Sequence, residues 1–333
     1  MAFSSAELAN IANAALDYYI DQGNVYANTL ADKPLLNLMD GKAKTFPGGK
    51  SDLSVAVKGV YTTQVAGYTH NDTVAYANPA NIQRANYAWK EHHSGISVTL
   101  TELKKDGISV TDSTTSNSVT NHSGRDKTVL VNLFQDKLDD MLEGYSRGMN
   151  DLLYGDGTAD ANALAGIRSI IVDDPTATGT TVGGLSTVTN TWWRNRANVA
   201  ISTTATGQEL IETLHSEMRQ LKRFGGKPDI AVCGSLFLDR LADELRRNGN
   251  YSNTGFSGNQ NIAVGEINYN GLKFVYDPAL DDLTISGQNP DKRCYIIDSS
   301  KLCMYYMDGE KMKRHSPARP ATQYAVSYTH LRA

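Results

Sequence analysis

A polar stretch between two strand-like segments constrains the fold of this chain most strongly. Residues 52–61 alternate apolar and polar side chains, and a second strand-like stretch runs through residues 87–100. Between them, the segment from Gln64 to Arg84 is rich in Asn, Thr, Ala and Gly. A structureless insertion of this length is uncommon inside a compact domain. The pattern therefore predicts a long hairpin arm that reaches away from the body and is held by contacts from outside the monomer.

The strongest helical pattern follows the arm. Apolar residues recur every three or four positions from Leu130 to Leu152, which predicts a helix over about 127–153 with a length of roughly 40 Å. A helix of this length does not fit a compact helical bundle. Residues 4–21 are also predicted to be helical, whereas 111–124 and 173–196 are expected to be connections.

The C-terminal half has an α/β pattern. Thr206 and Glu209 have capping-box spacing and predict a helix that ends at Gly225-Gly226. The remaining elements are expected to be a strand at 229–233, a helix ending near Gly249, a hairpin of 266–269 and 272–276 around Asn270-Gly271, and strands at 294–297 and 302–307. The fold class is therefore α+β, with a long arm and a long helix.

Composition limits the classes of function. The net charge is −4, from 32 basic and 36 acidic residues, which argues against a strongly basic nucleic-acid binder. The three cysteines, Cys233, Cys294 and Cys303, are sparse and predict reduced thiols, with Cys233 as a small core residue. The first residues lack a basic region followed by an apolar stretch, so no secretory signal is expected, and no apolar run reaches membrane-spanning length. We therefore expect a soluble protein that is intracellular when made.

No catalytic, cofactor-binding or metal-binding residues are predicted. His92 and His93 are adjacent, so on a strand they would point to opposite faces and could not easily share a metal. Asp156 and Asp160 lack the rest of a calcium-loop pattern. No nucleotide-binding glycine loop is complete.

Two aromatic or basic groups leave alternatives open. Trp192-Trp193 could stack on bases, but packing is the favoured interpretation because few basic residues lie nearby. A late basic cluster is expected to be a solvated face rather than a phosphate-facing surface; its members are Lys311, Lys313, Arg314, His315 and Arg319.

The order of these elements resembles that of the tailed-bacteriophage major capsid protein family, which has the Hong Kong 97-type coat fold. The segments that carry the resemblance are Leu153–Gly157, Gly166-Ile167, Asp174–Asn195 and Gly271–Pro278. The resemblance covers most of residues 1–320.

The resemblance implies a division of the chain. It consists of an N-terminal arm (1–44), an extended loop or β-hairpin arm (45–100), a peripheral domain (101–200) with a spine helix at about 125–153, an axial domain (201–290), and strands that return to the body (291–325). The last residues, 326–333, resemble the translation of a sequencing adapter and are left out of the fold prediction.

The resemblance also implies a structural, non-enzymatic function without cofactors. Copies of the chain would assemble in a bacterial host's cytoplasm into the pentamers and hexamers of an icosahedral virion shell around double-stranded DNA. The DNA would be contacted non-specifically, scaffolding and portal proteins are possible partners, and no membrane is involved. A cellular nanocompartment shell of the encapsulin type is the first alternative, and an enzyme with an α/β domain is the distant one. Lys58 and Lys90 lie on the arm without a cross-linking motif, so no isopeptide bond is assigned.

Overall fold

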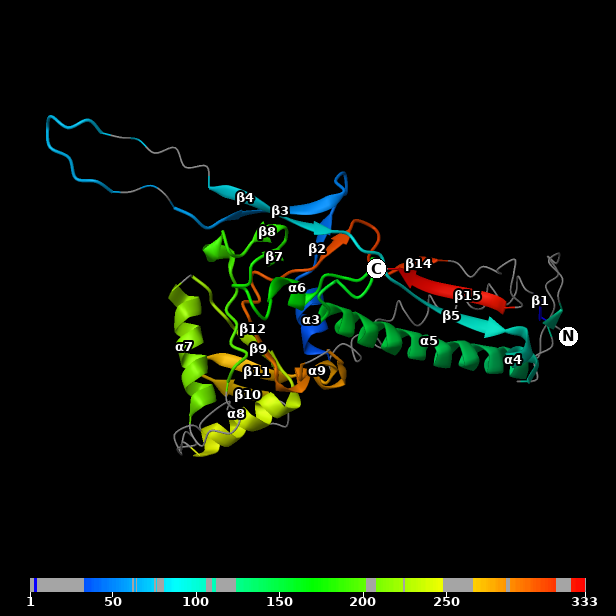
Figure 1. Ribbon diagram of the computed structural model, residues 1–333. Coiled ribbons are helices and arrows are strands. Elements are labelled where there is room, and N and C mark those ends of the chain that lie inside the picture. Colours follow the sequence, from blue (N-terminus) through cyan, green and yellow to red (C-terminus); the bar gives the residue numbers. More distant parts are fainter. Residues whose placement is uncertain are drawn as a thin grey trace.

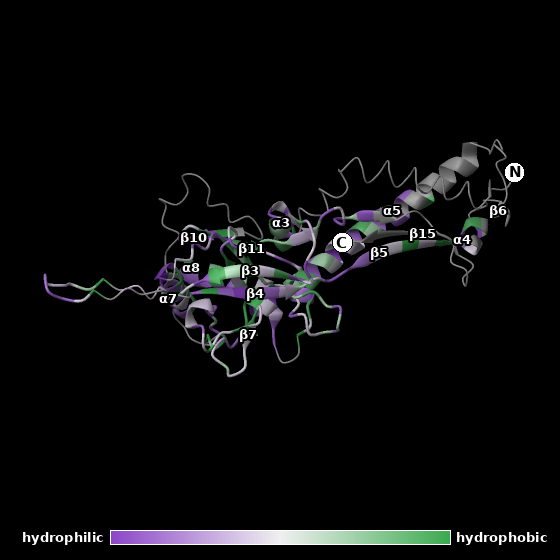
Figure 2. Cartoon of the chain, turned by 90° about the horizontal axis from the view of Figure 1, so that it is seen from above, coloured by the Kyte–Doolittle hydropathy of each residue, from purple (hydrophilic) through white to green (hydrophobic). Residues whose placement is uncertain are grey.

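The described parts of the chain form an elongated, shallow body with a hairpin projecting from it (Figures 1 and 2). The computed structural model describes residues 3–4, 33–61, 63, 65–74, 76, 81–105, 110–111, 124–201, 208–223, 225–247, 266–285, 288–315 and 325–332. The predicted mixture of helices and strands is confirmed within these ranges.

A four-stranded sheet organises the α/β domain. Its order is β10 (Glu266–Tyr269), β11 (Leu272–Tyr276), β9 (Ile230–Cys233) and β12 (Cys294–Ile297). β11 is parallel to β9, and the other two pairings are antiparallel. The predicted hairpin is confirmed, because Tyr269 pairs with Leu272 and both turn residues, Asn270 and Gly271, have positive φ.

Two apolar cores lie on opposite faces of this sheet. One face packs Ala231, Cys233 and Phe274 against α7 (Glu209–Arg223) and α8 (Ser235–Arg247). The other face packs Val232 and Tyr295 against α3 (Pro34–Gly41) and the C-terminal end of α5 (Gly124–Leu153). The sheet therefore packs on the domain's own helices with one face and on the long helix with the other.

The long helix is confirmed: α5 spans 30 residues. It lies alongside a three-stranded sheet of β14 (Lys313–His315), β15 (Ala325–Arg332) and β5 (His93–Thr99) (Figure 1). Lys137 on α5 pairs with Glu102 in α4 (Leu100–Lys105) at 2.8 Å and donates to the Ser97 carbonyl on β5 at 3.3 Å. These contacts fix the helix against the sheet edge.

A buried carboxylate links the long helix to the α/β domain. Asp277, which follows β11, is fully buried. It accepts hydrogen bonds from Asn150 Nδ2 at 3.1 Å, from the Tyr154 hydroxyl at 2.8 Å and from the Ala279 amide at 3.0 Å. The Asn150 side-chain oxygen in turn accepts from the Leu36 amide on α3 at 3.2 Å. Three elements thus meet at one satisfied polar cluster.

The second strand of the arm differs from its prediction. The expected strand over 87–100 is two strands, β4 (Ile82–Ala88) and β5, and Leu100 already belongs to α4. Residues 89–92 separate the two strands; there the Trp89 ring packs on Phe46, with centroids 5.3 Å apart, and Lys90 Nζ donates to the Ala161 carbonyl at 2.6 Å. β4 then pairs within the arm, whereas β5 pairs with β15.

Other boundaries also required correction. The predicted helix start at Ser4 is wrong, because β1 (Phe3–Ser4) pairs with β6 (Val110–Thr111); residues 5–21 lie outside the described residues. The same pairing places Thr111 in a strand, and 112–123 are not described. The predicted strand at 302–307 begins only at Tyr305, as β13 (Tyr305–Met307), which pairs with β2 (Lys44–Phe46).

The C-terminal segment has a place in the fold. Residues 325–332, all but the first of which were left out of the fold prediction, form β15 between β14 and β5. The adapter interpretation and the domain division both stay predictions.

Candidate functional site

The extended hairpin is the candidate functional element. β3 (Asp52–Lys58) pairs antiparallel with β4 in continuous register from Asp52–Ala88 to Lys58–Ile82. Beyond this ladder, the described residues of 59–81 continue away from the body (Figure 1). The hairpin therefore presents a long surface that its own body does not cover.

Apolar side chains on the hairpin are exposed. Val65 is 104% exposed, Tyr76 is 93% exposed and Tyr61 is 75% exposed. Among the described residues, seven of the eleven large apolar side chains that are exposed lie between 60 and 82: Val60, Tyr61, Val65, Tyr68, Val74, Tyr76 and Ile82. Concentrated exposure of this kind marks an interaction surface.

The hairpin tip is closed by a local turn. The Asp72 carboxylate accepts hydrogen bonds from the Thr69 amide and the Thr69 hydroxyl, each at 2.7 Å, and the Asp72 amide donates to the Thr69 carbonyl at 2.9 Å. These hydrogen bonds lower the pKa of Asp72. The tip therefore keeps a defined shape without contacts to the body.

The base of the hairpin rests on the connection that follows α5. β7 (Thr181–Val182) and β8 (Leu185–Ser186) form a short hairpin whose Gly183 carbonyl accepts from the Asn86 amide at 2.9 Å. Gly183 has a φ of +58°, and a Cβ there would lie 2.8 Å from the Ala85 Cβ. Only glycine fits this close approach.

The two tryptophans complete this support. They lie in η1 (Thr191–Trp193), and a Cβ at Gly59 would lie 1.9 Å from the Trp192 ring. Trp193 Nε1 donates to the Val182 carbonyl at 3.0 Å. Both rings are thus part of the packing under the hairpin.

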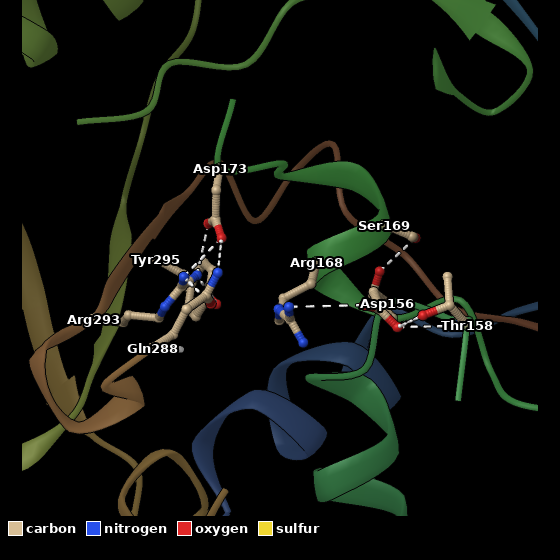
Figure 3. Close-up of polar contacts among 9 residues, drawn as sticks. Asp156, Thr158, Arg168, Ser169, Asp173, Gln288, Arg293 and Tyr295 are labelled. Atoms are coloured by element: carbon tan, nitrogen blue, oxygen red, sulfur yellow. Dashed lines mark hydrogen bonds and ion pairs between the residues drawn. The ribbon is translucent and has the colours of Figure 1, made fainter. Parts of the chain in front are cut away.

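An ion pair ties the same connection to the α/β sheet (Figure 3). Asp173 and Arg293 form two parallel hydrogen bonds, Nη1 to Oδ1 and Nη2 to Oδ2, each 2.7 Å long. Gln288 Nε2 adds a hydrogen bond to Asp173 at 2.8 Å, and Arg293 Nη1 donates to the Tyr295 hydroxyl at 3.2 Å. The hydrogen bond with Arg293 is the main reason why the pKa of Asp173 is lowered, and the same bond raises the pKa of Arg293.

The residues singled out in the sequence do not form a common site. Asp156 accepts from Thr158 and pairs with Arg168 at 3.7 Å (Figure 3), and no group of three metal-ligating side chains occurs in the described part of the chain. His92 precedes β5, and burial lowers its pKa. Within the same residues, no helix combines the length and apolarity that a membrane crossing requires.

The late basic cluster is partly neutralised. Lys311 pairs with Asp40 at 2.6 Å, and Lys313 pairs with Glu310. Arg314 and His315 lie in β14, and Arg319 lies outside the described residues.

The sequence pattern predicted the hairpin but not the two glycines at its base, Gly59 and Gly183, because an isolated glycine carries no signal of its tertiary contacts.

Comparison with solved structures places the fold among phage capsids. The chain is similar to a chain of the capsid asymmetric unit of cyanophage A-1(L), with a TM-score of 0.59 and 15% identity over 90% of this chain and 87% of that chain. It is also similar to a chain of the mature capsid of bacteriophage PhiM1, with a TM-score of 0.50 and 10% identity over 87% and 79% of the two chains. No family model and no curated protein sequence matches the chain. At these identities, the likeness concerns the fold.

Proposed function

We propose that this chain is the major capsid protein of a tailed phage, with the Hong Kong 97-type arrangement of arm, spine helix and axial domain. In this proposal, it has a structural rather than an enzymatic role. Copies assemble in the bacterial host into pentamers and hexamers of an icosahedral shell around double-stranded DNA, which they contact non-specifically. Scaffolding and portal proteins are candidate partners. The likeness to two capsid chains over most of both lengths supports this role.

The observation that carries the proposal is the uncovered apolar surface of the hairpin. Side chains such as Tyr61, Val65 and Tyr76 remain solvated in the single chain. Covering one such side chain contributes about 1.5–3 kcal/mol. Burial of several such side chains offsets part of the free-energy cost of the translational and rotational entropy lost on association. A hairpin with these properties is unfavourable in an isolated monomer and useful in a lattice of copies.

Electron microscopy and sedimentation of the expressed chain test the proposal. We expect closed shells, rings or tubes for the natural sequence. A variant in which Asn-Gly replaces residues 62–80 should retain the circular dichroism of the body but sediment as a monomer. A matched control, Val199→Ser, changes an exposed apolar residue off the hairpin and should still assemble. Monomers of the natural chain at high concentration, or full assembly of the shortened variant, would contradict the proposal.

The contents of shells purified from a phage-infected host separate a virion from a nanocompartment. Nuclease-protected double-stranded DNA supports the phage capsid. Shells that contain protein cargo and no DNA would instead identify a cellular compartment of related architecture.

A further inference from the structure

Two cysteines lie opposite each other in the α/β sheet. β12 is antiparallel to β9 with Cys294 paired to Cys233, and their Sγ atoms are 3.1 Å apart. Both side chains face the core beneath α7 and α8. This contact has no local signal in the sequence because 61 positions separate the two residues. All three cysteines are thiols in the structure, as the sequence predicts, but two of them are in contact.

The register of the strands suits a covalent link. The neighbouring amide of Gly234 donates to the Arg293 carbonyl at 3.0 Å, so the cysteines occupy the adjacent non-hydrogen-bonded position of the ladder. Cα atoms at such positions are about 4.5 Å apart, which falls within the range of about 4.4–6.8 Å that disulfides span. The spacing of the two backbones is therefore compatible with a disulfide.

The backbone at this end of the sheet is closely held. A Cβ at Gly234 would lie 2.3 Å from the carbonyl oxygen of Asp291, a residue of η3 (Pro290–Lys292). This close crossing and the hydrogen bond to Arg293 fix the two strand ends against each other. The sulfur atoms are consequently kept in proximity by the fold.

We propose that Cys233 and Cys294 are a redox-active pair that a small peroxide oxidises to an intramolecular disulfide. Cys294 is partly exposed and accepts a hydrogen bond from the buried Cys233 thiol, so its sulfur is the one that reacts first. After losing its proton, that sulfur attacks one peroxide oxygen and breaks the O–O bond. The other oxygen takes up the proton and leaves as water.

The second step joins the two sulfurs. Burial and the hydrogen bond to Cys294 raise the pKa of the Cys233 thiol, so Cys233 enters this step as a thiol. The Cys233 sulfur then attacks the Cys294 sulfur, the S–O bond breaks, and the oxygen leaves as a second water with the Cys233 proton. Two thiols are oxidised and one peroxide is reduced to water.

The Cys233–Cys294 disulfide would close a loop that contains most of the α/β domain. The closed loop contains α8, β10, β11 and α9 (Ala279–Asp282). Because a cross-link over a loop of this size removes entropy from the unfolded chain, the melting temperature should rise by roughly 5–10 °C. This effect does not depend on assembly, so it is separable from the proposed capsid role.

Treatment of the purified full-length chain with dilute hydrogen peroxide tests the proposal. We expect the loss of two titratable thiols per chain, a Cys233–Cys294 peptide in a non-reduced digest, and a raised melting temperature that dithiothreitol reverses. Cys303→Ser is the control that retains the pair and should behave like the natural chain. Cys294→Ser should lose both the linked peptide and the temperature shift.

A second variant distinguishes loss of the cysteine pair from a folding defect. Cys233→Ala keeps a small apolar residue in the core and should also lose both effects. Three results would overturn the proposal: no thiol loss, a cross-link that involves Cys303, or oxidation of Cys294 to the sulfinic acid without a link to Cys233.

Discussion

Replacement of Tyr154 by Phe tests how the long helix is attached to the α/β domain. The Tyr154 side chain is 1% exposed, and its hydroxyl donates to the buried Asp277 carboxylate at 2.8 Å. The Phe ring fills the same space, so the substitution removes a hydrogen-bond donor and leaves the packing intact. A hydrogen bond to a charged group contributes about 1.5–3 kcal/mol. We therefore expect the free energy of unfolding to fall by about 2 kcal/mol.

Urea unfolding of the full-length chain at low protein concentration, followed by tryptophan fluorescence, measures this loss. The midpoint should fall, and the slope should stay unchanged because the same surface is exposed on unfolding. Tyr276→Phe is a matched control, since the Tyr276 hydroxyl donates to Asp281 at 2.7 Å where both groups are partly exposed. Water replaces that hydrogen bond, so the control should lose less than about 1 kcal/mol.

A double-mutant cycle isolates the interaction. In an Asp277→Asn background the acceptor is no longer charged, so Tyr154→Phe should cost at least about 1 kcal/mol less than it does in the natural chain. Equal losses in both backgrounds, or a loss for Tyr154→Phe no larger than for the control, would refute the argument that the buried carboxylate holds the helix in place.

Three further substitutions test other contacts. Gly59→Ala places a Cβ 1.9 Å from the Trp192 ring; the ring must move, so we expect a red-shifted tryptophan emission and weaker assembly by sedimentation. Arg293→Met removes the two-fold hydrogen bond to Asp173 and should lower the free energy of unfolding by about 2 kcal/mol at pH 7. Because Arg293 lowers the Asp173 pKa, that difference should be present above the usual value of 3.8 and shrink as the pH falls below it in urea titrations. Glu244→Ala removes a buried carboxylate that caps the first amides of α7 and should cost about 2–4 kcal/mol, with a loss of helical circular dichroism on heating.

The strand boundaries near residues 89 and 4 both depend on long-range pairing. The strand pattern over 87–100 is continuous in sequence, yet Trp89 and Lys90 turn toward residues far along the chain and divide it into two strands with different partners. Alternation of apolar and polar residues indicates that a segment can form a strand, but it does not indicate where one strand ends and the next, with a different pairing partner, begins. The same limit applies to Ser4, whose strand depends on a pairing with Thr111.

Contacts between remote residues were beyond sequence reasoning altogether. Neither the 3.1 Å approach of Cys233 and Cys294 nor the fit of Gly59 under Trp192 has a local signature. Each depends on the relative placement of two backbones. The exposed surface of the hairpin, in contrast, could be anticipated, since its polar, small-residue composition offered too little apolar area for a core of its own.

Elements with a local cause could be derived from the order of the residues alone. The long helix α5 follows from a repeat of apolar residues at helical spacing, and the hairpin of β10 and β11 follows from Asn270-Gly271, whose backbones accept positive φ. Three other features became evident only in the folded chain: which strands pair, which face of the sheet meets α5, and which polar groups are buried together at Asp277. The spacing of apolar residues along the chain specifies whether a segment is a helix or a strand, but the same spacing is compatible with many long-range contacts. Close packing of distant segments selects one set of these contacts.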